Sequence, residues 1–400
     1  MLLTLTAFAQ LTNTNTPVLD VAHLYCQSCH LFPEPALLDK QSWVKGALRR
    51  MAPLLGAAKL DFERRPDGKI LKEAGLFPSG PLISEHDWRE IIRYYQENAP
   101  TDPAPQKTQT KIEFDLKRFK PQPLRYPGAT HLTSLVRIDP GKSRIFVGNA
   151  AARSLDVVSL EGKLLSRTQL ESAPVDLAVR PEGLFVTLIG DLFPSDERKG
   201  KLVLLTETNG VAEVRTILDQ LSRPTSSTFA DLNNDGRDDL VLCSFGNYLG
   251  RFSWYERTPA GLFSEHVLLE QSGAVNSVLY AGPKTARPDI YVLTAQGREG
   301  IHRFRYSENQ FIHETIAEFH PAFGSSHLEL VDFDRDGFPD LLVTNGDNGD
   351  YPSRLKNYHG VRLYMNDGAG HFHERWFYPL NGAFKALAAD FDGDGDLDIA

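Results

Sequence analysis

A unit of about 50 residues recurs from residue 130 to the end of the chain, and this period constrains the fold most strongly. Its clearest part is an apolar run that leaves through a glycine turn, as at residues 184–191, 240–247, 290–297 and 341–347. Four strands per unit at this period are typical of a propeller blade, whereas the repeats of the alternative, a β-solenoid, are usually shorter. We therefore expect an all-β propeller over residues 112–400, with blades beginning near residues 130, 173, 223, 273, 325 and 383.

Three of these repeats carry the same acidic loop, with the pattern D-x-[DN]-x-D-G-x-x-D, between their first and second strands. The loops run from Asp231 to Asp239, from Asp332 to Asp340 and from Asp390 to Asp398. Alternate positions can direct oxygens at one centre, and the glycine permits a sharp reversal. Strands follow each loop, whereas an EF-hand loop runs into a helix. A solvated acidic turn could explain one loop, but three at the same place in a repeat favour metal binding.

The sequence therefore predicts a Ca²⁺ site in each acidic loop, because Ca²⁺ prefers hard oxygen ligands. Position 7 of each loop would contribute its backbone carbonyl. The expected ligands are Asp231, Asn233, Asp235, Arg237, Asp239, Asp332, Asp334, Asp336, Phe338, Asp340, Asp390, Asp392, Asp394, Asp396 and Asp398. The equivalent segments 179–183 and 282–289 lack these ligands, so we expect their blades to close without metal.

A long loop at residues 345–360 is an insertion relative to the equivalent loops of other repeats. Long loops are often functional, and this one concentrates polar and aromatic side chains on one rim of the expected propeller. A variable solvated loop is the alternative. The candidate ligand-binding residues are Tyr351, Arg354, Lys356, Tyr358 and His359.

The N-terminal part contains Cys26-Gln-Ser-Cys29-His30, a C-x-x-C-H string. At this spacing two thiols can attach to haem vinyl groups while the imidazole binds iron. A thioredoxin-like redox pair is the alternative, but it expects a preceding strand, and residues 20–25 have the pattern of a helix. The third cysteine, Cys243, stands alone in an apolar run and fits a buried core position. We expect covalent haem c on Cys26 and Cys29, with His30 as the proximal iron ligand.

The sixth iron ligand is less constrained by the sequence. Met51 is the available sulfur, because Met1 is terminal and Met365 lies in a predicted strand of the repeats. Core packing is the alternative role for Met51. His23 and His86 are the nitrogen alternatives, although each fits a histidine on a helix surface better.

Helical spacing fills the region around this motif. Trp43, Ala47, Leu48 and Met51 share one helical face, and Ser84 begins a capping box before an amphipathic helix that ends near residue 98. We expect a small all-α domain over residues 17–98. Residues 99–111 alternate proline with small polar residues and should form a semi-extended linker.

The ends and the charge of the chain add further expectations. Residues 1–9 end in Ala7-Phe-Ala9, the small-residue pattern of a secretory cleavage site, so residues 1–16 are predicted to be a signal remnant and leader. The final blade stops inside a strand, so we expect a fragment, with completion of that blade by strands near residues 112–125 as the alternative. The net charge of −9 argues against nucleic-acid binding, and no apolar run is long enough for a transmembrane helix. Common catalytic motifs are absent, so no catalytic residue is assigned.

With these motifs in place, residues 20–100 resemble a small class of c-type cytochrome domain, and residues 130–400 resemble FG-GAP or VCBS repeat propellers. The pairing is similar to that of exported bacterial proteins. The resemblance implies a periplasmic or extracellular haem c electron-transfer protein, with a calcium-stabilised propeller that docks a redox partner protein. An adhesion or glycan-binding propeller with an ancillary haem domain is the alternative, as is a periplasmic oxidoreductase with haem as electron acceptor.

Overall fold

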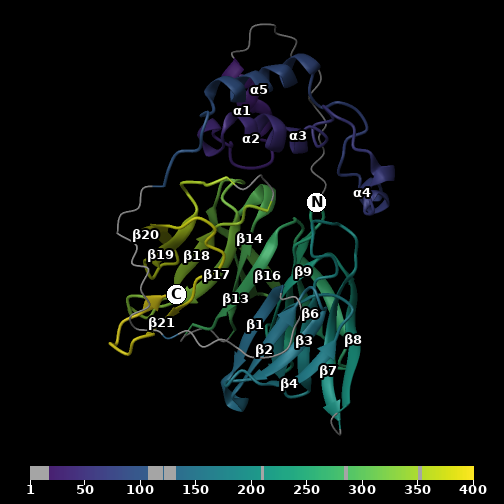
Figure 1. Cartoon of the computed structure of the whole chain (residues 1–400), viewed down its shortest axis with the longest axis vertical. Helices are drawn as coiled ribbons and strands as arrows, with labels where there is room; N and C mark the ends of the chain where they lie inside the picture. Colours follow the sequence, from purple (N-terminus) through teal and green to yellow (C-terminus); the bar gives the residue numbers. More distant parts are fainter. Residues whose placement is uncertain (1–17, 107–119, 121–131, 209–210, 283–286, 350–353) are drawn as a thin grey trace.

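The computed structural model describes residues 18–106, 120, 132–208, 211–282, 287–349 and 354–400. Residues 18–106, here called the helical region, lie against one end of a ring of β-sheets formed by residues 132–400 (Figure 1). The predicted signal remnant at 1–16 and the end of the predicted linker lie outside the described residues. Within the described part of the chain, no helix has the length and apolar character needed to cross a membrane.

The helical region consists of short helices and turns. The helices are α1 (Val18–Cys26), α2 (Lys40–Ser42), the π-helix η2 (Trp43–Ala47), α3 (Leu48–Met51), α4 (Gly68–Ala74) and α5 (Glu85–Asn98), with 3₁₀ turns at η1 (Pro35–Leu37) and η3 (Phe62–Arg64). The predicted cap at Ser84 is confirmed, because its side chain accepts a hydrogen bond from the Asp87 amide at 3.0 Å. Asp39 caps α2 in the same way, through the amides of Gln41 and Ser42.

Two aromatic residues organise the core of this region. The rings of Trp43 and Tyr95 lie 4.1 Å apart, and both side chains are fully buried. Their polar atoms are satisfied by the segment that follows the C-x-x-C-H motif: Trp43 Nε1 donates to the Pro35 carbonyl and Tyr95 Oη to the Pro33 carbonyl, each at 2.9 Å. The core of the helical region therefore fixes the chain just after the motif.

The β-region forms five four-stranded antiparallel sheets, each with its strands in sequence order, as a propeller requires. The first three sheets are β1 (Thr133–Asp139), β2 (Arg144–Asn149), β3 (Ser154–Ser159) and β4 (Leu164–Gln169); β5 (Pro174–Arg180), β6 (Gly183–Leu188), β7 (Gly200–Thr208) and β8 (Val211–Leu221); and β9 (Pro224–Ala230), β10 (Asp239–Ser244), β11 (Arg251–Arg257) and β12 (Phe263–Leu269).

The remaining sheets complete the five-bladed propeller, and the predicted all-β propeller fold is confirmed. They are β13 (Ala274–Tyr280), β14 (Asp289–Thr294), β15 (Gly300–Ser307) and β16 (Gln310–Glu318); and β17 (Ser325–Val331), β18 (Asp340–Asn345), β19 (Gly360–Asn366) and β20 (Phe372–Pro379). A two-stranded sheet of β21 (Ala388–Ala389) and β22 (Asp398–Ile399) follows. The described residues of the sixth predicted blade therefore form only these two short strands.

Burial explains why the repeat is visible in the sequence. The second strand of a blade lies between two neighbours of its own sheet and packs on both faces, so that every residue of β10 and β18 is buried. Cys243 belongs to β10 and is fully buried, as its apolar context predicts. The apolar runs that set the period of about 50 residues are these second strands.

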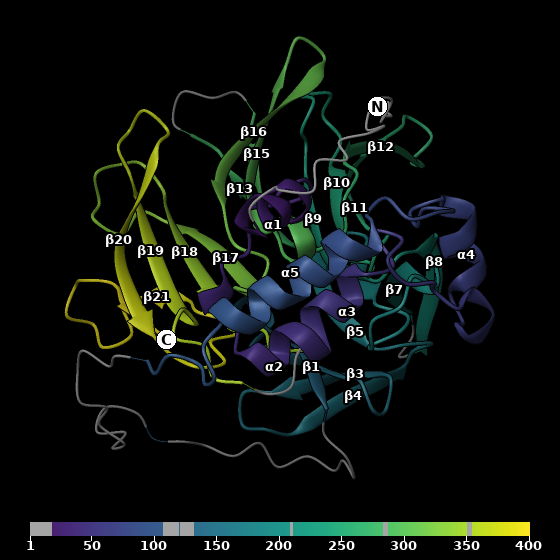
Figure 2. The same ribbon diagram turned by 90° about the horizontal axis from the view of Figure 1, so that it is seen from above.

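The first strands of successive blades are neighbours, and side-chain oxygens join them. Asp176 on β5 accepts a hydrogen bond from the Ser227 amide on β9 at 2.7 Å. Glu329 on β17 likewise accepts one from the Ala388 amide on β21 at 2.9 Å. Seen from above, down the axis of the propeller, the helices α1, α2, α3 and α5 lie over its centre (Figure 2).

Candidate functional site

The C-x-x-C-H motif begins at the C-terminal end of α1. Cys26 is the last residue of α1 and is only 7% exposed, whereas Cys29 in the following turn is exposed. Neither thiol is in a disulfide. The motif thus presents two separate thiols and an adjacent imidazole, the donor set that covalent haem attachment needs.

His30 is held in one tautomer by the turn that follows the motif. Its Nδ1 lies 2.7 Å from the carbonyl oxygen of Leu31, which can only accept, so Nδ1 carries the proton and Nε2 keeps its lone pair. This is the arrangement of an iron-binding histidine, whose other ring nitrogen normally donates to a carbonyl or a carboxylate. Burial lowers the pKa of His30, and the positive charges of Arg298 and His320 lower it further, so the neutral, ligating form is favoured.

The alternative of a thioredoxin-like redox pair fits this geometry poorly. A helix, α1, precedes the motif where that fold would place a strand. Burial raises the pKa of the Cys26 thiol to about 11, whereas reactive cysteines in such pairs have a lowered pKa.

The three candidates for the sixth iron ligand lie in different surroundings. Met51 is the last residue of α3 and is half-buried. Among the described residues, it is not a member of the buried cluster that contains Trp43 and Tyr95. The ring of His23 stacks on Phe32 at 3.7 Å. His86 is exposed in the first turn of α5.

The propeller contacts the motif directly. Arg298, in the loop between β14 and β15, donates from Nε to the carbonyl oxygen of Cys29 at 2.7 Å. Ala322, in the loop between β16 and β17, is buried within the core cluster of the helical region. No motif in the sequence marked either residue, because their role depends on where the helical region lies.

A second set of contacts comes from other propeller loops. The amide of Asp196 donates to Asp67 Oδ2 at 3.0 Å, next to the start of α4. The ring of Tyr248 packs against Phe77 at 5.2 Å, in an edge-to-face arrangement. Asp196 in turn accepts hydrogen bonds from three successive amides of the Tyr248 loop, so this contact joins two blades to the helical region.

The long loop that the sequence marked as a ligand rim contributes to the same interface. Tyr358 Oη donates to the carbonyl oxygen of Leu37 at 2.8 Å, and Arg354 Nε lies 3.6 Å from Asp39 Oδ2. These two residues therefore dock the helical region, and their role in ligand binding stays a prediction. Tyr351 lies outside the described residues.

The other two residues of this loop point inward. Lys356 is buried and donates to the Ala322 carbonyl at 3.1 Å. His359 is fully buried, and neither ring nitrogen makes a hydrogen bond within the described part of the chain. Burial lowers the pKa of His359 to about 3, and the neighbouring charges of Lys356 and Arg362 act in the same direction. Both side chains are thus unavailable to a ligand on the outer rim.

The three acidic loops share one backbone conformation. Position 4 has a positive φ in all of them, at 63° for Asn234, 61° for Arg335 and 76° for Gly393. The glycine at position 6 has φ of 82° at Gly236, 93° at Gly337 and 99° at Gly395, a region that L side chains rarely adopt. The turns therefore follow from the shared pattern.

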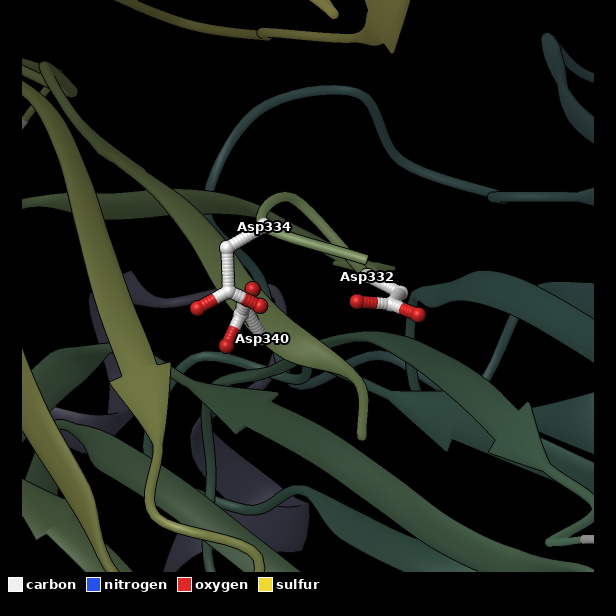
Figure 3. A group of neighbouring side chains, drawn as sticks. All are labelled: Asp332, Asp334 and Asp340. Carbon is white, nitrogen blue, oxygen red and sulfur yellow. The ribbon is translucent and has the colours of Figure 1, made fainter. Parts of the chain in front are cut away.

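In two of these loops the carboxylates of positions 1, 3 and 9 come together. Asp332, Asp334 and Asp340 each offer an oxygen within 4.8 Å of the others, and Figure 3 shows this group. Asp390, Asp392 and Asp398 form the second group with the same spacing. Burial raises the pKa of Asp340, and the charges of Asp334 and Asp336 raise it further, so this group would gain from a cation.

The first loop, residues 231–239, differs in charge. The amide side chain of Asn233 stands where the other loops have a carboxylate, and the guanidinium of Arg237 pairs with Asp235. Asp239 is fully buried, and its carboxylate accepts hydrogen bonds from the amides of Arg257 at 2.8 Å and Leu232 at 3.3 Å. This loop offers fewer anionic oxygens to a cation than its two counterparts.

The remaining predicted metal ligands serve the turns of their own loops. Asp231 Oδ1 accepts the Asp235 amide at 3.1 Å. Asp336 Oδ1 accepts the Phe338 amide at 2.9 Å, and Asp394 Oδ1 accepts the Asp396 amide at 3.2 Å. The carboxylate of Asp394 raises the pKa of the exposed Asp396 carboxyl by a hydrogen bond and by its charge.

Comparison with known proteins supports the repeat assignment. A family model described as an FG-GAP-like repeat matches residues 350–400, which include β19–β22 and the third acidic loop. The expected FG-GAP character is confirmed for this part. No curated protein sequence matches the chain significantly.

Solved structures with a related shape are distant in sequence. A 6-phosphogluconolactonase-like protein from Bacteroides uniformis has a TM-score of 0.45 and 12% identity, covering 64% of this chain and 74% of that one. An auxiliary nutrient binding protein from Bacteroides thetaiotaomicron has a TM-score of 0.41 and 10% identity, covering 62% of each chain. At this level of similarity neither protein indicates what this chain binds.

Proposed function

We propose that the protein is an exported haem c electron-transfer protein, in which the helical region carries the haem and the propeller positions it for a redox partner protein. The observation that carries this proposal is His30, whose Nδ1 donates to the Leu31 carbonyl and whose Nε2 remains a lone-pair donor beside two uncrosslinked thiols. Cys26 and Cys29 would form the thioether bonds, and His30 would bind the iron.

The residues around the motif suit a fixed one-electron site. The bound haem would supply reversible one-electron exchange. Trp43 and Tyr95 hold the segment after the motif through its carbonyls, and Arg298 holds the motif from the propeller. Such outer contacts fix ligand orientation, which reduces rearrangement when the iron changes its charge.

The propeller would bind Ca²⁺ at the two carboxylate groups and, more weakly, at residues 231–239. The clustered carboxylates of Asp332, Asp334 and Asp340 support this part of the proposal, since a cation would offset their mutual repulsion. A periplasmic or extracellular location agrees with both cofactors, because haem c is attached outside the bacterial cytoplasm and calcium-binding modules of about millimolar affinity are extracellular.

A ligand-binding propeller with an ancillary haem domain is the second candidate, and one cleft favours it. A cleft of about 460 Å³ lies between the first acidic loop and the next blade, and its size is in the range of ligand pockets. It is lined by Asn234, Arg287, Asp289, Arg305, Tyr306, Ser307 and Ile312. Two arginines beside a tyrosine would suit an acidic sugar. Calorimetric titration with glucuronate, compared between the wild type and Arg305→Ala, would test this candidate.

Haem staining after denaturing electrophoresis tests the main proposal. The full chain is matured in a bacterial periplasm with haem c attachment. The wild type and the Cys243→Ser control should keep the stain, because Cys243 lies in the core of a blade. Cys26→Ser combined with Cys29→Ser should lose it. A wild type without stain, or a double variant that keeps it, would contradict the proposal.

A further inference from the structure

Two histidines in the blade of β13–β16 meet through their ring nitrogens. His302 lies on β15 and His313 on the neighbouring strand β16, and His313 Nε2 is 3.1 Å from His302 Nδ1. In the register of these strands, His302 is opposite Thr315 and Phe304 is opposite His313. Since residues two apart on a strand point the same way, all four side chains lie on one face of the sheet.

A chain of hydrogen bonds fixes the tautomer of His302. The buried hydroxyl of Thr294, at the end of β14, donates to the carbonyl oxygen of Arg298 at 2.9 Å and lies 3.2 Å from His302 Nε2. A hydroxyl has a single proton, and the carbonyl takes it, so the Thr294 oxygen accepts a hydrogen bond from His302 Nε2. Nδ1 of His302 therefore keeps a lone pair, and His313 is the ring that faces it.

The second ring is oriented by stacking. The ring centres of His313 and Phe304 are 4.8 Å apart, and the two planes differ by only 12°. Phe304 is fully buried and forms a fixed support, whereas His313 is exposed on the outermost strand of its blade. One buried and one solvent-accessible imidazole thus face the same point, which gives an ion a path of entry.

The separation of the two nitrogens fits two ligands of one transition-metal ion. With metal–nitrogen bonds of about 2.0 to 2.1 Å, two ligand nitrogens lie about 3.3 Å apart at a tetrahedral ion and about 2.9 Å apart at a square-planar one. The observed 3.1 Å falls between these values. Metal-binding histidines normally donate from their other ring nitrogen, as His302 does to Thr294.

We propose that His302 Nδ1 and His313 Nε2 together bind one divalent transition-metal ion, such as Zn²⁺ or Cu²⁺, on the outer strands of this blade. Without the ion, His313 Nε2 donates its proton to His302. When the ion binds, His313 gives up that proton to solvent and takes one at Nδ1, so both facing nitrogens offer lone pairs. Water completes the coordination on the exposed side.

This site differs from the others in its donor atoms and does not depend on the proposed haem. Imidazole nitrogens suit Zn²⁺, Cu²⁺ and Ni²⁺, whereas the carboxylates of the acidic loops suit Ca²⁺. Excess Ca²⁺ should therefore occupy the acidic loops and leave the histidine pair open to Zn²⁺.

Calorimetric titration of the full chain with Zn²⁺ in excess Ca²⁺ tests the proposal. One Zn²⁺ should bind to the wild type, and His313→Ala should weaken that binding by at least tenfold. Zn²⁺ should also raise the melting temperature of the propeller in the wild type and not in His313→Ala. His266→Ala is the matched control, because His266 lies on the outermost strand of the preceding blade and stacks on Trp254 at 4.6 Å, but its Nε2 faces Glu256 instead of a second imidazole.

A second pair of variants tests how His302 is positioned. Thr294→Val removes the hydroxyl that accepts from His302 Nε2 and should lower the Zn²⁺ affinity about 10-fold to 100-fold, the usual range for an outer contact of a metal ligand. Thr294→Ser keeps the hydroxyl and should bind Zn²⁺ like the wild type. Equal affinity in Thr294→Val and Thr294→Ser would contradict the tautomer assigned to His302.

The C-x-x-C-H motif is also able to bind Zn²⁺ when it carries no haem, so its contribution must be separated. Cys26→Ser combined with Cys29→Ser should retain the Zn²⁺ of the histidine pair. With Cu²⁺ in its place, electron paramagnetic resonance of this haem-free variant should show two coordinated imidazole nitrogens. A wild type that binds no Zn²⁺, equal affinity in His313→Ala, or loss of the ion with the two cysteines would overturn the proposal.

Discussion

The two regions of the molecule depend on each other unequally. Every buried cluster of the propeller consists of propeller residues alone, and each blade packs against the next through its first strand. Among the described residues, the helical region has one such cluster; Ala322 of the propeller belongs to it, and Tyr358 packs against it. A propeller of five sheets can thus form its own core. The short helices of residues 18–106 rely on packing against a partner, and haem would add to it.

The largest expected effect comes from removing a large buried side chain from the core of the helical region. Trp43→Ala should destabilise that region by about 3 to 5 kcal/mol, because it removes a fully buried ring and its hydrogen bond to Pro35. Thermal unfolding followed by circular dichroism should show the helical signal melting earlier while the β-signal is unchanged. Trp376→Ala, at a 40% exposed position on β20, is the control. Equal loss of both signals would show that the two regions unfold as one unit.

Acid should act on the propeller through His302. Burial lowers the pKa of His302 to about 4, below the unfolded value of about 6.5, so the folded state favours the neutral ring. The neutral His302 ring therefore contributes fully to propeller stability above pH 6.5. This contribution is lost as the pH falls toward 4, because the unfolded state binds a proton there before the folded state does. His302→Gln should remove about 3 kcal/mol of this pH dependence from the propeller transition. Urea unfolding between pH 4 and 7 measures it, and an unchanged acid dependence would exclude His302 as its source.

Removal of calcium should destabilise the propeller and leave the helical region unaffected. If a site binds at about 0.1 to 1 mM, then roughly 2 mM Ca²⁺ stabilises the propeller by about 0.6 to 1.8 kcal/mol per site. Chelation should lower the propeller melting temperature and leave the spectrum of the proposed haem unchanged. Asp334→Ala should remove one site's contribution, and the matched Asn233→Ala should remove less, because its loop has fewer carboxylates. If chelation does not change the melting curve, all three loops are acidic turns that bind no stabilising metal.

The smallest expected effect concerns a single contact between the regions. Tyr358→Phe removes the hydrogen bond from the tyrosine hydroxyl to the Leu37 carbonyl and should destabilise the helical region by about 0.5 to 1.5 kcal/mol. Tyr364→Phe is the control, because the Tyr364 hydroxyl donates to Glu374 within one blade. Differential scanning calorimetry should show the first change in the helical transition and the second in the propeller transition. The opposite assignment would contradict the described interface.

The sequence predicts the propeller well because its determinants are local. Second strands such as β10 are buried on both faces and therefore show as apolar runs, and the glycines of the acidic loops occupy positions that require a positive φ. The C-x-x-C-H motif is equally local, and the structure adds the Nδ1 contact of His30.

The interface could not be predicted in this way, because it depends on how distant segments meet. Residues 345–360 have the composition of an exposed binding loop, yet Tyr358 contacts Leu37 across 321 positions of the chain. Arg298 carries no motif, and its contact with the Cys29 carbonyl exists only once the helical region lies over the ring. The uneven charge of the acidic loops was visible in the sequence at Asn233, but the pairing of Arg237 with Asp235 was not.

The contacts of Arg298 with Cys29, of Tyr358 with Leu37 and of Asp196 with Asp67 each use a side chain on one region and a main-chain atom on the other. A main-chain atom keeps its chemistry when its residue is replaced, so each contact can be lost by mutation at only one of its two positions. At these three contacts the two surfaces can diverge without matched changes, whereas the Arg354–Asp39 ion pair and the Tyr248–Phe77 ring contact join side chains of both regions. Analyses of correlated substitution among related chains should therefore link the regions through those two side-chain pairs rather than through the main-chain contacts.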